Sequence, residues 1–452
     1  MKGEDLESGL RTVVHMADYF RQLKRRAAGL AERITPQERG YFTTVEDDET
    51  RAVLVSYWHA RNALFDLINS FREDSESDDV SPRESFLIAF GAALLLVDAA
   101  RFLREVVDAR PIVRSKFNEP APQFGVPGGV YDAVQKSLVS TRHGWHLYHA
   151  IQYFNEHEIE LREIGRDTRY VPLLSCIDEL RHRLDVSITQ FAEAKLRTRA
   201  DQVMRQVGRS VLGRAFYGIQ KLAGNLAADK FLRYGHRPGL PNDVAEQVRN
   251  LLEPGDVLVV RKEYALTNYF LPGYWPHAAL YLGQAETLVE LGVHEQEHVK
   301  PRWTRMLETS LDSEGHVLES MRDGVNFRGL KSPFGSDSIV VLRPSVSRED
   351  LATALARCFA HEGKPYDFDF DFRRADRLVC TEVVYRSFDG VGSINIPLVQ
   401  RAGRPTLSGS DLIQMGIDEV NFTPVAVFAP VLTPGIVVGS QVRSVLVEGQ
   451  SR

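Results

Sequence analysis

The sequence is poor in cysteine, with only three in 452 residues: Cys176, Cys358 and Cys380. They are too few and too scattered for the disulfide framework of a small secreted domain or for a paired-cysteine metal site. This count leaves open a single reactive thiol, and a reducing cytoplasm suits such a thiol.

The chain also lacks an excess of positive charge and a long apolar run. Its formal net charge is −6 at pH 7, which gives no general attraction to phosphate backbones, so nucleic acid is not an expected partner. The first residues carry acids early and have no apolar signal-peptide core. The longest apolar run, residues 86–97, ends at Asp98 and is shorter than the ~20 residues that cross a bilayer. We therefore expect a cytoplasmic protein in which this run is a buried helix.

The two halves of the chain differ in periodicity. Up to about residue 235, apolar residues recur at three- and four-residue spacing, which predicts successive helices. Beyond the prolines and glycines of residues 235–244, β-branched runs predict strands at 257–260, 278–282, 287–291, 317–320, 339–342 and 425–428, with helices at 350–361 and 380–388. We predict an all-α helical bundle of unknown role over residues 1–240, followed by an α+β domain over 241–452.

Three local motifs of the second half suggest chemistry. Asp256 ends a turn that leads into a strand, His277 stands at the head of a strand, and Cys380 stands where a loop gives way to a helix. A helix N-terminus favours a thiolate, and a neighbouring imidazole lowers the thiol pKa further. The backbone N–H of Cys380 would also face a tetrahedral oxyanion. Taken singly, such a cysteine is more often a small buried hydrophobe, and such a histidine a structural residue.

The flanks of these residues add information, namely Pro254–Leu258, Trp275–Gly283 and Cys380–Tyr385. In order and spacing they resemble the permuted papain-like (YiiX/YebB-like) branch of the NlpC-type cysteine peptidases. The histidine precedes the cysteine, the reverse of the order in papain. The resemblance covers roughly 180 residues and implies a circularly permuted papain-like fold with a small antiparallel sheet. It also implies Cys380 as nucleophile and His277 as base, with no cofactor and no metal.

A third residue should orient the imidazole and fix its tautomer. The resemblance favours Glu319, in the segment 316–320 followed by Asp323-Gly324-Val325. Glu290 is the competing candidate, because residues 284–315 look like an insertion between the histidine strand and Glu319.

Further positions are weaker candidates for binding substrate or the oxyanion. They are Tyr366 in a Pro-Tyr-Asp segment, Asp256 and Trp275, and a packing role is an equal alternative for Tyr366. The alternating run Asp367, Asp369 and Asp371 suggests a cation site, but one solvated face and one buried face explain the alternation more simply.

Two features of the first half have both a functional and a structural interpretation. His143, His146 and His149 could share a ligand on a helix, but no carboxylate partner of metal-site spacing accompanies them, so a structural or surface role is favoured. Basic and apolar residues over 203–237 would suit a peripheral contact with an anionic membrane, although an ordinary packing helix is the preferred interpretation.

The expected function is hydrolysis of an amide or related acyl bond through a thioester, on a peptide-like or acylated small-molecule substrate. Lipid acyl transfer or lipid hydrolysis on the same fold is the first alternative, suggested by the apolar residues 270–275 before His277. A non-catalytic binding module, with the helical half docking a partner, is the second. The sequence defines neither the substrate nor the oligomeric state.

Overall fold

The computed structural model describes residues 3–70, 82–121, 124–138, 150–184, 238–262, 275–309, 315–401 and 404–450. The chain divides into two compact units, Met1–Pro122 with Val126–Phe231, and Leu232–Arg452 with Gln123–Gly125. The domain boundary at residue 240 stays a prediction.

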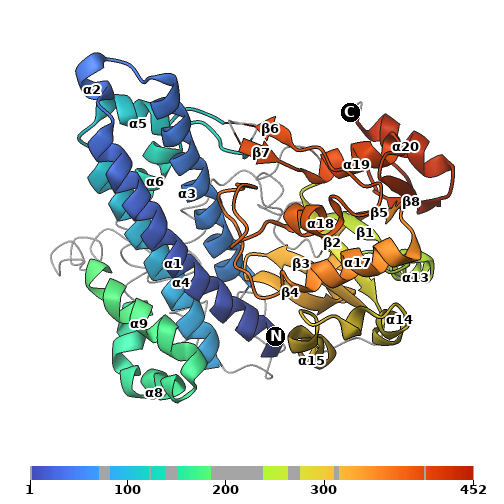
Figure 1. Cartoon of the computed structure of the whole chain (residues 1–452). Coiled ribbons are helices and arrows are strands. Elements are labelled where there is room, and N and C mark those ends of the chain that lie inside the picture. The colour runs from blue at the N-terminus through green and yellow to red at the C-terminus, as the bar shows by residue number, and fades with distance from the viewer. Residues whose placement is uncertain are drawn as a thin grey trace. The chain divides into compact units, whose positions relative to one another are not determined.

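The regular elements described in the first unit are all helices, joined by turns and by an isolated bridge between Ala121 and Val126. Its longest helices, α1 (Gly3–Arg33), α3 (Thr44–Ser70) and α4 (Pro82–Val107), pack against one another (Figure 1). Their facing sides bury large apolar side chains such as Phe20, Phe65 and Phe90. Shorter elements complete the unit: α2 (Pro36–Arg39), α5 (Pro111–Phe117), α6 (Val130–Leu138), α8 (Glu158–Glu163), η2 (Ile164–Arg166), η3 (Thr168–Tyr170), α9 (Val171–Leu180) and η4 (Arg181–Leu184).

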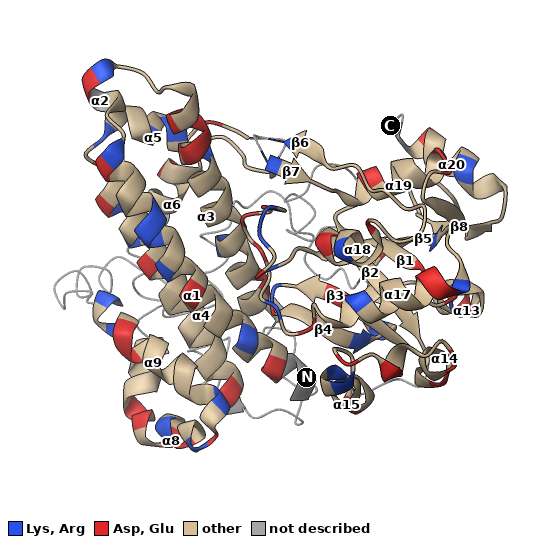
Figure 2. Ribbon diagram, in the orientation of Figure 1, with Lys and Arg blue, Asp and Glu red and all other residues tan. Residues whose placement is uncertain are grey.

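Helix α4 contains the longest apolar run. Among the described residues, α4 is the one helix that is long enough and apolar enough to cross a membrane. However, 89% of its most apolar stretch is buried within the protein. Such burial is typical of a core helix, as predicted for residues 86–97. Basic and acidic residues are interspersed along the helices of this unit (Figure 2).

The second unit is built on a seven-stranded sheet with the order β4-β3-β2-β1-β5-β8-β9, in which every neighbouring pair is antiparallel. The strands are β1 (Val257–Arg261), β2 (His277–Gly283), β3 (His316–Met321), β4 (Gly324–Gly329), β5 (Ser338–Pro344), β8 (Phe422–Phe428) and β9 (Val437–Val438). A separate hairpin is formed by β6 (Val399–Arg401) and β7 (Arg404–Thr406). The predicted fold class, a helical first part followed by an antiparallel sheet domain, is confirmed.

Helices accompany the sheet: α13 (Asn242–Leu251), α14 (Ala285–Glu290), η6 (Val293–Glu295), α15 (Lys300–Glu308), α16 (Lys331–Phe334), α17 (Arg348–Phe359), α18 (Cys380–Phe388), α19 (Gly409–Ile417) and α20 (Gln441–Gln450). Both faces of the central strands are covered. Val257 and Val259 of β1 belong to one apolar cluster and Leu258 and Val260 to another. Burial on both faces explains why β1 is a continuous apolar run instead of an alternating one.

The chain bends sharply where β1 begins and where β2 ends. Gly255 has φ +93°, a conformation open to glycine but strained for other residues. A Cβ there would also meet the Leu351 side chain at 2.4 Å. The N–H of Gly255 then donates to the carbonyl of Tyr281 at 2.8 Å, which sets the β1–β2 register.

The prediction of a strand at 287–291 was wrong, because these residues lie mainly in helix α14. Strand β4 was not predicted at all. It follows β3 through a turn in which Gly324 has φ +94°, and its sequence GVNFRG lacks a run of β-branched residues.

Candidate active site

The sheet brings His277 and Glu319 onto one face. Leu280 of β2 pairs with Leu318 of β3, so Glu319 is the diagonal neighbour of His277 when that register is continued. The Nε2 atom of His277 lies 2.7 Å from Oε2 of Glu319. The Glu319 side chain is 1% exposed and that of His277 is 24% exposed, so this contact is shielded from water.

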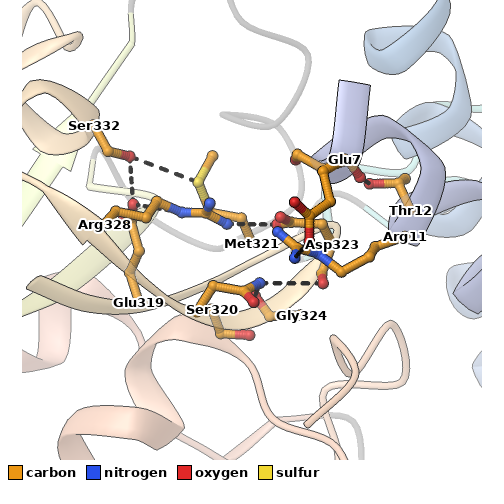
Figure 3. A network of polar contacts seen from close by, with 12 residues as sticks. Glu7, Arg11, Thr12, Glu319, Ser320, Met321, Asp323, Gly324, Arg328 and Ser332 are labelled. Carbon is orange, nitrogen blue, oxygen red and sulfur yellow. Dashed lines mark hydrogen bonds and ion pairs between the residues drawn. The ribbon is translucent and has the colours of Figure 1, made fainter. Parts of the chain in front are cut away.

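The second oxygen of Glu319 is also engaged (Figure 3). Its Oε1 accepts from the Ser332 hydroxyl and lies 3.1 Å from Nε of Arg328, which in turn pairs with Asp323 at 2.6 Å. Burial raises the pKa of Glu319, but the hydrogen bond and charge of His277, with Arg328 and Ser332, lower it to about 2. The carboxylate is therefore ionised at neutral pH and suited to orient an imidazole.

Cys380 is the first residue of α18, which packs against β2 and β3. It is 1% exposed, and its Sγ lies 3.9 Å from the carbonyl oxygen of Pro276, the residue before His277. Burial lowers the pKa of His277, but the charge of Cys380, a side-chain hydrogen bond with it, and the contact with Glu319 raise the pKa to about 10. The structure thus brings together Cys380, His277 and Glu319.

The alternative third residue lies elsewhere. Glu290 is the last residue of α14 and is exposed, and its backbone carbonyl accepts from Arg348 at 3.2 Å. The carboxylate that accepts a hydrogen bond from the imidazole is therefore that of Glu319.

The other cysteines lie in different surroundings. Burial raises the pKa of Cys176 to about 12, and it also raises the pKa of Cys358. Cys358 donates to the carbonyl of Leu355 within α17. Both are suited to packing and poorly suited to nucleophilic attack.

Several contacts hold the segment around Cys380. Ser320, the neighbour of Glu319 on β3, donates from Oγ to the carbonyl of Leu378 at 2.7 Å. Thr381 donates from Oγ1 to the carbonyl of Leu407 at 2.7 Å. Successive residues of a strand point to opposite faces, so β3 supports the imidazole through one face and the cysteine segment through the other.

Tyr366 lies beside this segment. It forms a parallel bridge with Leu378, and its ring lies 4.7 Å from that of Phe368, centroid to centroid. Burial raises the pKa of Tyr366 well above 10, and the charge of Cys380 adds to this effect. The bridge to Leu378 therefore holds Tyr366 beside the segment that leads into Cys380.

The other weak candidates are placed differently. Trp275 is 6% exposed and packs in the apolar cluster beneath α18, two residues before His277. Asp256 faces Tyr281, four positions along β2 from His277, or roughly 13 Å at the rise of a strand. The structure does not bring Asp256 to the cysteine. Its carboxylate instead accepts from Arg343 at 2.9 Å and from the N–H of Glu253 at 2.8 Å.

The acidic run does not have the solvated face that alternation suggested. Asp367 is fully buried and Asp369 is 8% exposed, while Phe368, Phe370 and Phe372 are buried too. Asp367 accepts the backbone N–H groups of Asp369 and Asp371, at 3.1 and 2.7 Å, and so closes a turn instead of extending a strand. Within the described ranges, no group of three or more His, Cys, Asp or Glu residues is arranged to hold a metal ion.

Sequence reasoning missed Arg328 and Ser332, which contact Glu319. It also missed Ser320 and Glu382, which bond to the backbone of the two residues just before Cys380. The Glu after Cys380-Thr381 was visible in the motif but was given no role. His143, His146 and His149, the segment 203–237 and residues 270–274 lie outside the described residues.

Part of the second unit matches a known protein family. Residues 251–428 match the model of a family described as permuted papain-like amidase enzyme, YaeF/YiiX, C92 family. Searches of curated proteins and of solved structures gave no match. The matched segment contains His277, Glu319 and Cys380 and every strand from β1 to β8. Over residues 251–428 this chain is therefore similar to the permuted papain-like amidase family, and this similarity suggests a hydrolytic enzyme.

Proposed function

We propose that the second unit hydrolyses an amide or related acyl bond through a thioester on Cys380. The observation that carries this proposal is the alignment of Cys380, His277 and Glu319, in which a buried, ionised carboxylate holds the imidazole next to a thiol at a helix N-terminus. This is the nucleophile, base and orienting group that acyl transfer requires.

The reaction has two halves. Glu319 holds Nε2 of His277, which leaves Nδ1 to take the proton of the Cys380 thiol. The thiolate attacks the carbonyl carbon, and His277 returns the proton to the leaving amine as the carbon–nitrogen bond breaks. Water then loses a proton to His277 and attacks the thioester, and Cys380 leaves and regains its proton.

Two groups are suited to bind the oxyanion. The first is the backbone N–H of Cys380, which lies in the first turn of α18, where N–H groups lack intrahelical partners. The second is the Tyr366 hydroxyl, which stays protonated because its pKa is raised. Trp275 is a weaker candidate for contacting substrate, because its side chain is buried and only its position next to Pro276 and His277 favours such a role.

The substrate is proposed to be a peptide-like or acylated small molecule. Lipid acyl transfer differs only in the second half, where an amine or hydroxyl replaces water as the acceptor of the acyl group. Mass analysis of the products, with and without an added amine, separates hydrolysis from transfer.

The test uses the full-length protein with p-nitrophenyl acetate, whose acyl group would be captured on Cys380. We expect release of p-nitrophenolate and an acetylated Cys380 peptide, with both lost in Cys380→Ser and strongly reduced in His277→Asn. If wild-type Cys380 is neither acetylated by this ester nor alkylated by iodoacetamide, the enzyme proposal fails and the non-catalytic binding module takes its place.

A further inference from the structure

Glu382 is a buried carboxylate that the proposed reaction does not use. It lies two residues after Cys380, in the first turn of α18, and its exposed fraction is 0%. Its Oε2 accepts the backbone N–H of Val379 at 3.1 Å, and its Oε1 accepts from Arg386 at 2.9 Å.

Arg386 extends this contact to the chain that leads to the cysteine. The same guanidinium nitrogen donates to the carbonyls of Phe372, at 3.1 Å, and of Arg374. Both carbonyls lie in the segment that runs from Tyr366 to Cys380. Glu382 therefore contacts the end of this segment directly and its middle through Arg386.

This arrangement differs from ordinary helix capping. At the start of α19, Ser408 and Asp411 cap each other, the serine hydroxyl accepting the N–H of Asp411 and the carboxylate accepting the N–H of Ser408. The corresponding residue of α18 is Val379, which has no side-chain acceptor, so only the carboxylate half of the motif is present.

The carboxylate is also costly to place here. Burial, together with the charge of Asp367, raises the pKa of Glu382 to about 8, although the Val379 N–H and Arg386 oppose this rise. A capping carboxylate such as Asp411, whose side chain is 18% exposed, avoids much of that cost. The cost suggests a role beyond starting a helix.

The Val379 contact bears on the geometry of the oxyanion site. Because the peptide bond is planar, the direction of the Cys380 N–H follows the backbone angles of Val379, φ −86° and ψ 169°. A hydrogen bond to the N–H of Val379 restrains these angles from the other side of the same residue.

We propose that Glu382 is a positioning residue, which holds the Val379–Cys380 peptide so that the Cys380 N–H faces the oxyanion and, through Arg386, holds the segment that carries Tyr366. This inference rests on the proposed function, because it assigns a support to the same reaction. Glu382 touches neither substrate nor reacting atoms.

The test compares two reactions of Cys380 in the full-length protein, each followed by mass analysis of the Cys380 peptide. Iodoacetamide is displaced by the thiolate at a saturated carbon, with loss of iodide, and forms no oxyanion. p-Nitrophenyl acetate is attacked at its carbonyl, passes through an oxyanion and loses p-nitrophenolate. A support for the oxyanion donor affects the second rate and spares the first.

At a pH above 8, where Glu382 is ionised, we expect Glu382→Gln to lower the acylation rate by about threefold to tenfold. The reason is that an amide accepts more weakly than a carboxylate and presents an N–H to Arg386. Glu382→Met, which has similar volume and no such acceptor, should lower it by about tenfold to a hundredfold, approaching the loss of one oxyanion donor. Alkylation should stay within about twofold in both variants. If the Met variant does not fold, the Gln variant alone decides.

Asp256→Asn is the matched control. The buried carboxylate of Asp256 also accepts from one backbone N–H and from one arginine, but it lies just before β1, at the end of that strand away from His277. The variant's ratio of acylation to alkylation should equal that of wild type. An unchanged ratio in Glu382→Gln, or an equal loss in both reactions, overturns the role of Glu382 and leaves the proposed function standing. Failure of wild-type acylation and alkylation would instead remove the proposed function.

Discussion

At the residue scale, Glu319 is a buried carboxylate with several partners. It lies between His277 and Arg328 and also accepts a hydrogen bond from Ser332. We predict that Glu319→Gln lowers kcat/KM for p-nitrophenyl acetate by about 10²-fold to 10⁴-fold, because His277 loses most of its action as a base when no carboxylate orients it. The reason is that a neutral amide no longer stabilises the imidazolium.

Glu290→Gln is the control for that substitution. Its side chain is exposed at the end of α14, so kcat/KM should stay close to that of wild type. Equal losses from the two variants would remove Glu319 from its assigned role.

The raised pKa of His277 makes the stability of the protein depend on pH. The pKa is about 10 in the folded protein against 6.5 for the free side chain, so the stabilisation is complete below pH 6.5 and is lost as the pH rises toward 10. We predict that the difference in unfolding free energy between wild type and Glu319→Gln shrinks over this window. Urea unfolding at several pH values measures it, and a constant difference would contradict the prediction.

Single residues of the site differ in how far the sequence could predict them. Cys380 and His277 stand at element ends with characteristic flanks, and Glu319 lies between them in the sequence in a recognisable segment. Their catalytic roles stay predictions. Arg328 and Ser332 could not be predicted, because they reach Glu319 only through the pairing of β3 with β4 and the short helix α16 that follows.

At the element scale, the start of α19 packs closely against β1 and against the residues just before β2, the strand that carries the histidine. A Cβ at Gly409 would lie 2.4 Å from the backbone oxygen of Trp275 and 3.0 Å from Val259. We predict that Gly409→Ala destabilises the protein by about 1–3 kcal/mol, as overpacking does, and lowers acylation of Cys380, since Trp275 is two residues before His277.

Thermal unfolding and the acylation rate measure these effects. Gly435→Ala is the control, because a Cβ there meets nothing within 4 Å. If both alanine variants behave alike, the close approach at Gly409 has no influence on the site.

Elements were predicted well where periodicity was distinctive and poorly where it was not. The helix at Cys380 and the strands of the central sheet are long or strongly apolar. The run TLVEL at 287–291 fits both a strand and one turn of helix. The helix is favoured because Leu288 and Leu291, three residues apart, pack on the core while Val289 is exposed. Strand β4 depends on its partner β3 and on the Gly324 turn, which periodicity cannot detect.

At the scale of the whole molecule, each compact unit has its own buried apolar residues. Phe90 lies in the helical unit at 1% exposure, and Phe388 lies in the sheet unit at 0%. We predict that Phe90→Ala and Phe388→Ala each cost about 3–5 kcal/mol and lower the temperatures of different transitions in calorimetry. A single transition shifted equally by both variants would show that the units unfold as one.

The fold class, helical first and then an antiparallel sheet, could be predicted because the change from helical to β-type periodicity near residue 240 is abrupt. The sequence could not assign a role to the helical unit, since its buried residues serve packing and carry no arrangement tied to one reaction.

The chain holds three sulfhydryl groups, and the pKa is raised by burial at Cys176 and Cys358. An electrophile used in stoichiometric amount near neutrality should therefore report on one sulfur out of three without any engineering of the others. Labelling the unmodified protein would then measure the active fraction of a preparation, because the fraction of molecules that takes up one label is the fraction correctly folded around Cys380.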